Sequence, residues 1–224
     1  MSGTRTPTRS VHVHREVRRA ILGGVLRPGS RLSPLALAEQ YGVSLGVVRE
    51  ALTRLGEQGL VLSQPQQGFQ VLPLSREDLL DLTSVRLDLE PLALRRSVER
   101  GTVEWRSQLI AAHHVLERTP EHDLGPDASC VVNEEWAVAH RAFHLQLLAG
   151  CGSRRLVEIA TTLRDAAEVY RRWSTPLASE PRDVAGEHRA ILQAVVEDGD
   201  PELAASRLAH HIAHTTDVLI EHAN

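Results

Sequence analysis

The sequence is poor in the residues that mark several common classes of protein. It contains no lysine, so all 25 basic side chains are arginines, and Phe, Trp and Tyr together make up only 3% of it. A hydrophobic fraction of 42% still supports a sizeable core, which must be built mainly from Leu, Val, Ala and Ile. No apolar run approaches the ~18 residues that a membrane-spanning helix needs, so no membrane partner is expected.

The sequence has only two cysteines, Cys130 and Cys151, and they form no CxxC motif. Residues 1–10 are polar and lack the apolar segment of a secretory signal. We therefore expect a cytoplasmic protein with reduced thiols. The length of 224 residues favours two domains.

The net charge of −4 conceals an uneven distribution. Residues 1–74 contain nine arginines and four acidic residues, whereas residues 75–224 contain sixteen arginines and twenty-five acidic residues. A basic N-terminal part joined to an acidic body predicts that only the first part meets a polyanion such as DNA. Ten of the twelve histidines lie in the second part, which makes that part the place to look for metal chemistry.

The N-terminal third has the element order of a winged helix-turn-helix. Apolar residues at helical spacing predict a first helix over residues 11–25, and Ser33 and Pro34 are typical of a helix start. Gly42 ends that short second helix, and Ser44 caps a third helix, after which two extended runs predict a small hairpin. The third helix would enter the major groove of DNA. The alternative is a three-helix domain that merely packs on the rest of the chain.

This third resembles the DNA-binding domain of GntR-type regulators over about sixty residues. The resemblance is carried by Gly29, Arg31-Leu32-Ser33, Leu37-Ala38-Glu39, Gly42-Val43-Ser44, Val48-Arg49-Glu50-Ala51-Leu52, Leu55, Gly59-Leu60-Val61 and Gly68-Phe69-Gln70-Val71. It implies that Ser44 and Arg49 contact DNA and that Gly68 lets the wing approach the minor groove. The predicted DNA-contact residues are Arg31, Ser33, Ser44, Leu45, Gly46, Arg49 and Gly68.

One part of the motif departs from the family. Many members have Arg, then Thr and Pro, after the Ser of the GVS segment, where this sequence has Leu45, Gly46 and Val47. A recognition helix without that Arg lacks one guanine or phosphate contact. Either the operator differs from the common one, or affinity depends on other arginines, namely Arg31, Arg49, Arg54 and an arm over residues 1–10 with Arg5 and Arg9. Arg31 and Arg54 are equally well explained as solvated surface residues.

From Ser75 onward the sequence shows only helical periodicity broken by turn signals. A capping box at Ser75 opens the first of six predicted helices, in which Pro91 is expected to produce a kink. The six run from Ser75 towards Gly101, from Thr102 to Arg118, from Val131 to Ala149, from Arg154 to Trp173, from Arg182 to Glu197 and from Pro201 to the end, with a loop over residues 119–128. The predicted fold class is therefore mostly α, a winged helix-turn-helix over 11–74 followed by an all-helical bundle over 75–224.

The histidines that bear on metal binding lie on three of these helices. His140 and His144 are four residues apart and point from one helix face, and imidazoles from two other helices can converge with them on a metal ion. Taken alone, this spacing is also typical of packing or surface histidines.

The segments Arg86 to Glu90, Phe143-His144, Glu187-His188 and Ala204 to Ile212 are similar to the FadR-type C-terminal domain of GntR regulators, called FCD. The resemblance implies a divalent metal held by His144, His188 and His211, with His140 at a position where the family has Asp. Four imidazoles favour zinc, nickel or copper over harder ions, and zinc or nickel is the expected cofactor. His210 and His214 are expected to be bystanders, and Ser153 stands where the family commonly has Asn.

The resemblance also implies a carboxylate effector that completes the metal coordination and is clamped by Arg86. A guanidinium suits a planar carboxylate, although Arg86 could equally form an intrahelical pair with Glu90. The predicted function is that of a DNA-binding transcription regulator and not an enzyme. In the leading form it is a homodimeric repressor of double-stranded operator DNA, relieved by a small organic acid.

Two other functions remain open from the sequence. A metalloenzyme would need a general base near a metal-bound water, and Glu187 is the only acidic residue adjacent to a predicted ligand. A structural metal would rigidify the bundle without sensing anything.

Overall fold

The structure is a computed structural model that describes residues 9–23, 25–64, 68–124, 130–174 and 182–221. The chain divides into two compact units, which are described separately. The first consists of residues 1–75 together with 165–173, and the second of residues 76–164 and 174–224.

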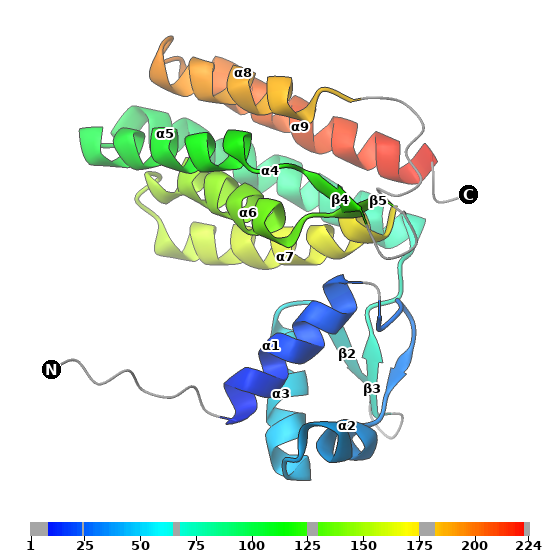
Figure 1. Cartoon of the computed structure of the whole chain (residues 1–224). Helices are drawn as coiled ribbons and strands as arrows, with labels where there is room; N and C mark the ends of the chain where they lie inside the picture. Colours follow the sequence, from blue (N-terminus) through cyan, green and yellow to red (C-terminus); the bar gives the residue numbers. More distant parts are fainter. Residues whose placement is uncertain (1–8, 24, 65–67, 125–129, 175–181, 222–224) are drawn as a thin grey trace, which may run out of the picture. The chain divides into compact units, whose positions relative to one another are not determined.

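The first unit is a winged helix-turn-helix, as predicted (Figure 1). Its helices are α1 (Arg9–Leu22), α2 (Pro34–Tyr41) and α3 (Leu45–Glu57), and its strands are β1 (Arg31–Leu32), β2 (Val61–Gln64) and β3 (Gly68–Val71). The strands form one antiparallel sheet in the order β1-β3-β2. Apolar residues of α1 and α3, among them Val17, Ile21, Leu52 and Leu55, are fully buried in its core.

Local capping explains why α2 and α3 begin where they do. The Ser33 hydroxyl accepts a hydrogen bond from the backbone N–H of Ala36 at 3.3 Å, and Pro34 follows it at the first helical position. Gly42 ends α2 in the left-handed conformation, with φ of 61°, which costs a residue without Cβ nothing. Ser44 then caps α3 by accepting from Val47 N at 3.5 Å.

Strand β1 is absent from the sequence-based prediction, which placed only a turn before α2. Arg31 and Leu32 pair with Gln70 and Phe69 of the wing. A two-residue strand has too few residues to show alternation, and its pairing depends on a partner far along the chain. The predicted turn at Arg27-Pro28-Gly29 is present, since Ser30 N donates to the Arg27 carbonyl at 3.0 Å, and the sequence analysis made no prediction for the two residues of β1.

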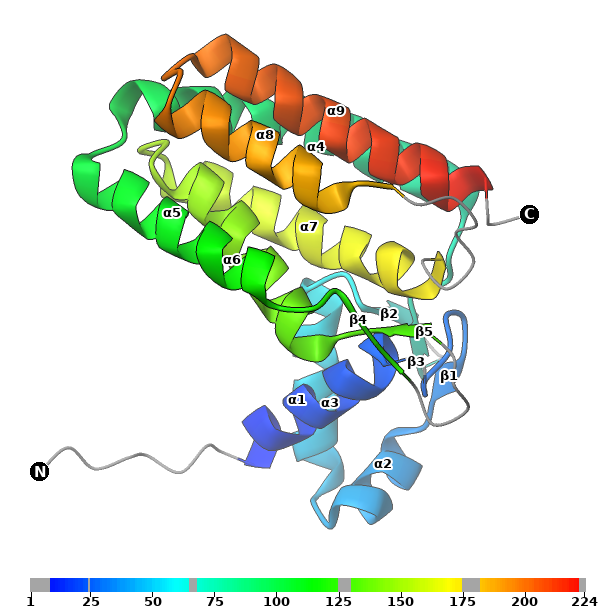
Figure 2. The same cartoon turned by 45° about the horizontal axis from the view of Figure 1, so that its top comes forward.

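In its described residues the second unit contains six helices, the number that the sequence predicted (Figure 2). They are α4 (Arg76–Arg100), α5 (Val103–Arg118), α6 (Glu134–Ala149), α7 (Arg154–Ser174), whose residues 165–173 belong to the first unit, α8 (Val184–Val196) and α9 (Pro201–Glu221). Helix α4 continues through Pro91 to Arg100, so proline does not end it. None of the helices in the described parts of the chain is long and apolar enough to cross a membrane.

The second unit is not entirely helical, which corrects the prediction of an all-helical domain. Residues His122–Leu124 and Cys130–Val132 form two short antiparallel strands, β4 and β5, where the sequence predicted a loop and the start of a helix. Helix α6 begins only at Glu134, because Asn133 accepts from Trp136 N at 2.9 Å and caps it there. Strands of three residues are too short to show a period.

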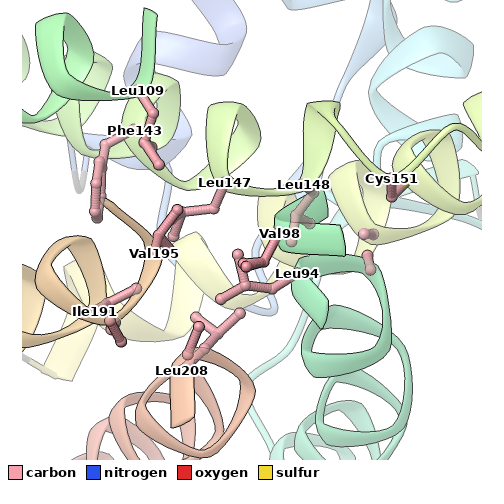
Figure 3. Close-up of a cluster of buried hydrophobic side chains, with 14 of the residues drawn as sticks. Leu94, Val98, Leu109, Phe143, Leu147, Leu148, Cys151, Ile191, Val195 and Leu208 are labelled. Carbon is pink, nitrogen blue, oxygen red and sulfur yellow. The ribbon is translucent and has the colours of Figure 1, made fainter. Parts of the chain in front are cut away.

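The core of the second unit is built mainly from aliphatic side chains, joined by Phe143 and two tryptophans. Fully buried residues from all six described helices meet in it (Figure 3), and they include Leu94, Leu109, Phe143, Ala160, Ile191 and Leu208. Trp105 closes one side, where its indole N–H donates to the Gln146 carbonyl at 2.7 Å. The scarcity of aromatic residues is thus met by dense aliphatic packing, as the composition predicts.

Candidate functional site

Four histidines from three helices converge inside the second unit. His140 and His144 come from α6, His188 from α8 and His211 from α9, and each is at most 8% exposed. One ring nitrogen of each lies within 4.8 Å of the corresponding atom of the others. The structure therefore brings together all four histidines that the sequence singled out as metal ligands.

The spacing of the ring nitrogens suits a tetrahedral ion. The Nε2 atom of His144 lies 3.1 Å from that of His140 and 3.2 Å from that of His188. Ligands at the usual zinc–nitrogen distance of ~2.0–2.1 Å are about 3.3–3.4 Å apart across a tetrahedral edge. The single Nε2 of His144 cannot donate a proton to two neighbours at once, whereas three nitrogen lone pairs can share a cation. The donor set therefore fits a divalent metal.

Burial keeps these imidazoles in the form that binds metals. Loss of solvation lowers the pKa of His144 and of His188 well below 6.5, and neighbouring Arg164 adds to the effect on both. Burial also lowers the pKa of His211 to about 4, although Glu187 opposes that shift. These three rings are neutral at pH 7, as ligation requires.

Aromatic rings hold the cluster on one side. The indole of Trp136 stacks on His140, with centroids 4.6 Å apart and 13° between the planes. Phe143 meets His144 and His188 edge-on, in both cases at 5.4 Å, and also meets the buried ring of His113 at 5.3 Å. The rings cannot turn freely, so the ligand positions are fixed by packing.

On another side of the cluster, Glu187 binds the ring that α9 contributes. Its carboxylate accepts from His211 Nδ1 at 2.7 Å and from His214 Nδ1 at 2.8 Å. The guanidinium of Arg182 also donates to both carboxylate oxygens. The carboxylate is therefore engaged with cationic and N–H donors, and this is not the placement of a general base facing a reacting water.

A buried group of two arginines and one glutamate is the second polar feature of the interior. Arg86 Nε donates to Glu90 at 2.6 Å, and Arg164 Nη1 donates to the other oxygen of the same carboxylate at 2.7 Å. Glu90 is fully buried and each arginine is 8% exposed. The pair between Arg86 and Glu90 therefore forms, and the same carboxylate also binds Arg164 from α7.

Arg164 and Trp136 were not predicted from the sequence. Trp136 lies four residues before His140, so helical spacing alone could have indicated that it shares a face with the candidate ligand. Arg164 carries no such signal, since it is one arginine among many on an amphipathic helix and its partner Glu90 lies far away in the sequence.

A cavity of about 150 Å³ adjoins the cluster. Its lining includes His113, Leu116, Glu117, Trp136, Val184 and His188. His188 belongs to both the cavity and the histidine cluster, and Trp136 is the ring that stacks on His140. The volume is below the roughly 300–1,000 Å³ of a typical ligand pocket, so the cavity admits only a few non-hydrogen atoms.

In the first unit, the predicted DNA-contact residues lie at the surface. Ser44, Leu45, Gly46 and Arg49 form the exposed N-terminal part of α3, where a recognition helix presents its side chains. Arg31 and Ser33 are also exposed, at the start of β1 and before α2. Gly68 begins β3 with φ of 86°. Arg9 opens α1, whereas Arg5 lies outside the described residues.

The sequence matches two families of known proteins, one for each part of the chain. Residues 9–71 match the gntR family of bacterial regulatory proteins, and residues 81–214 match the FCD domain. The chain belongs to the GntR family of regulators and carries an FCD domain. Since these families and the relatives below are those of transcriptional regulators and not of enzymes, this GntR regulator is not a metalloenzyme.

Two relatives are similar to this GntR regulator over most of its length. The HTH-type transcriptional regulator BphR of Paraburkholderia xenovorans is 35% identical over 91% of this chain and 82% of the relative. The HTH-type transcriptional repressor GlaR of Escherichia coli is 30% identical over 91% and 92%. Among solved structures, E. coli McbR/YncC superposes with a TM-score of 0.74 at 23% identity, covering 98% of this chain and all of that one, which shows a shared fold.

Proposed function

We propose that this GntR regulator is a homodimeric repressor whose affinity for operator DNA is controlled by a small carboxylic acid bound beside a divalent metal ion. The observation that carries the proposal is the convergence of four buried imidazoles. Repression is supported by two relatives, the repressor GlaR and the probable D-xylose utilization operon transcriptional repressor of Paenarthrobacter nicotinovorans, which is 30% identical over 86% of this chain and 80% of the relative.

The proposed ligands are His140, His144, His188 and His211. Four nitrogen donors favour zinc or nickel over magnesium, calcium or manganese, which prefer oxygen. A bound ion would supply a Lewis-acidic contact for the oxygen of a carboxylate. The imidazole of His140 adds no negative charge, unlike an aspartate, so the loaded site would attract an anion more strongly.

The proposed clamp for the acid is made by Arg86 together with Arg164. Glu90 fixes one N–H group of each arginine, and this orients both guanidinium planes before a ligand arrives. The two guanidinium groups complement a carboxylate. The buried setting strengthens that attraction relative to the protein surface.

The proposed DNA contacts lie on α3 and the wing. Ser44, Leu45, Gly46 and Arg49 would face the major groove, with Arg31 and Ser33 beside them, and Gly68 would let the wing approach the minor groove. A dimer of twofold symmetry would read two half-sites of a palindrome. Effector binding would then change operator affinity by a coupling energy of about 1–3 kcal/mol.

A second candidate function is a structural metal that stabilises the bundle and senses nothing. The observation that favours it is the donor count, because four protein ligands fill a tetrahedral site and leave no position for a further ligand, as in structural zinc sites. Under that function a chelator should lower the melting temperature, and no carboxylate should change DNA binding.

Fluorescence anisotropy with the full chain tests the proposal. The duplex is the intergenic DNA beside the gene, and a scrambled duplex is the control. We expect preferential binding to the native duplex, and we expect a panel of small carboxylates to include one that weakens binding about 5- to 150-fold with zinc but not after chelation. His144→Ala should abolish the response, whereas His210→Ala, an exposed residue of α9, should retain it. A metal-loaded chain that binds DNA but responds to no carboxylate would favour the structural-metal function.

A further inference from the structure

The contacts of Glu187 single it out among the acidic residues of the second unit. It lies on the first turn of α8, directly before the candidate ligand His188, and its side chain is only 16% exposed. Its carboxylate nevertheless contacts a different candidate ligand, His211 of α9, at 2.7 Å from Nδ1. Two of the three helices that supply ligands are thus joined at one carboxylate.

This contact determines which nitrogen of His211 carries the proton. A carboxylate oxygen at 2.7 Å is an acceptor, and two lone pairs would repel at that distance. This contact is much shorter than the 3.3 Å approach of Arg182 Nη2 to the same atom, so it places the proton on Nδ1. In the neutral ring Nε2 is then bare. The bare nitrogen is the one available to the ion, and the other atoms that converge here, on His140, His144 and His188, are also Nε2.

The carboxylate is itself held in place. Arg182, which lies just before α8, binds both of its oxygens. The same guanidinium donates to Thr215 Oγ1 at 2.8 Å and to the His211 carbonyl at 3.1 Å, so it is anchored on α9. Four hydrogen bonds therefore fix the position of the acceptor relative to the ring that it orients.

His144 provides a contrast within the same cluster. Its Nδ1 atom is buried and has no hydrogen-bond partner, so no outer contact selects its tautomer. Among the ligands, His211 has an anionic partner that both selects the tautomer and raises the basicity of the ring.

We infer that Glu187 is a positioning residue for the metal, which acts by holding His211 with Nε2 deprotonated and directed at the other three imidazoles. The inference rests on the proposed metal site and assigns to that site a residue outside the ligand set. It also gives Glu187 a role different from that of a general base.

Metal affinity provides the test, measured on the full metal-free chain by competition between the protein and a fluorescent zinc chelator. Glu187→Gln keeps the size of the side chain and removes its charge, and we expect zinc affinity to fall by about 10- to 100-fold. Glu187→Ala should weaken binding at least as much. The matched control is His214→Gln, which removes the other imidazole on the same carboxylate and should leave affinity within about twofold.

The tautomer is measured separately in the unaltered chain. Nitrogen-15 NMR of the histidine rings at pH 7, without metal, should show His211 protonated on Nδ1, a result that does not depend on whether a variant folds. An Nε2-protonated His211, or equal zinc affinities of Glu187→Gln and the unaltered chain, would overturn the inference and leave the proposed function standing. An unaltered chain that binds no zinc would overturn both.

Discussion

The indole of Trp136 lies flat against the imidazole of His140, one helical turn further along α6, with 4.6 Å between ring centroids and 13° between ring planes. His140 occupies the position where the resembled family has an aspartate. A carboxylate at this position would be oriented by hydrogen bonds, whereas here an imidazole is oriented by stacking on a neighbour of the same helix face. The two residues thus form one structural unit, which makes Trp136 a natural reporter of what His140 binds.

Tryptophan fluorescence should therefore respond to the metal. We expect Cu²⁺ to quench the emission with a stoichiometry of one ion per chain, because the ion would bind next to a ring in van der Waals contact with the indole. Trp136→Phe should remove most of the quenching while Cu²⁺ still binds in a dialysis measurement. Quenching that survives in Trp136→Phe would place the ion near another tryptophan.

Glu90 should be essential for the stability of the second unit. Glu90→Gln removes the carboxylate charge that Arg86 and Arg164 both contact, and we expect the free energy of unfolding to fall by about 3–5 kcal/mol. This corresponds to a loss of about 6–20 °C in melting temperature for a unit of this size. The control is Glu158→Gln on α7, an exposed residue paired with Arg154, whose loss should change the free energy by no more than about 0.5 kcal/mol. Similar melting curves for the two variants would show that the buried group is not stabilising.

Acidification should destabilise the metal-free chain before its carboxylates titrate. The pKa values of His144, His188 and His211 are lower in the folded chain than the usual 6.5, so the unfolded state binds more protons below that pH. Stability is therefore fully present above about pH 6.5 and declines as pH falls towards about 4, where His211 itself titrates. Each histidine that stays neutral in the folded state but is protonated in the unfolded state lowers the free energy of unfolding by up to about 1.4 kcal/mol for each pH unit of acidification.

Urea denaturation at pH 7.5, 6 and 5 measures this slope. His211→Gln should show a shallower dependence than the unaltered chain, because one of the depressed groups is gone. The pKa values of Glu90 and Glu187 are also lowered in the folded chain, so their protonation destabilises it too, but only below about pH 4.5. Stability that is constant or rises between pH 7.5 and 5 would contradict the prediction.

Substitutions at two glycines of the first unit should distinguish an effect on folding from an effect on DNA binding. Gly68 of the wing and Gly42 after α2 have φ of 86° and 61°, and a Cβ added to either meets no atom within 4 Å. Alanine at either position should cost about 1–2 kcal/mol from backbone strain alone. Only Gly68→Ala should also weaken binding to operator DNA, because only the wing is proposed to approach the groove. Equal DNA affinities of the two variants would argue against a wing contact.

The helix-turn-helix could be predicted from the sequence because its signals are local. Ser33, Gly42 and Ser44 satisfy backbone groups at helix ends, and such contacts need no knowledge of the rest of the fold. Strand β1 could not be predicted, since Arg31 and Leu32 are extended only through pairing with β3. Strands β4 and β5 could not be predicted either, because they too are extended only through pairing with each other.

The candidate site was predictable in part for a related reason. The spacing of His140 and His144 places them on one face, but only the family resemblance indicated His188 and His211 as their companions. The Arg164–Glu90 contact joins two helices far apart in the sequence, so no local sequence pattern predicts it. The role of Glu187 was likewise hidden, because its partner is His211 on another helix and not the adjacent His188.

The burial of the histidines has a calorimetric consequence. Metal uptake by proteins is commonly accompanied by proton release, since the ligands must first lose their protons. Here His144, His188 and His211 are neutral before metal binds at pH 7, because burial lowers their pKa values. Zinc binding should therefore release few protons to the buffer. The heat of zinc binding should then be nearly the same in buffers of very different ionisation enthalpy.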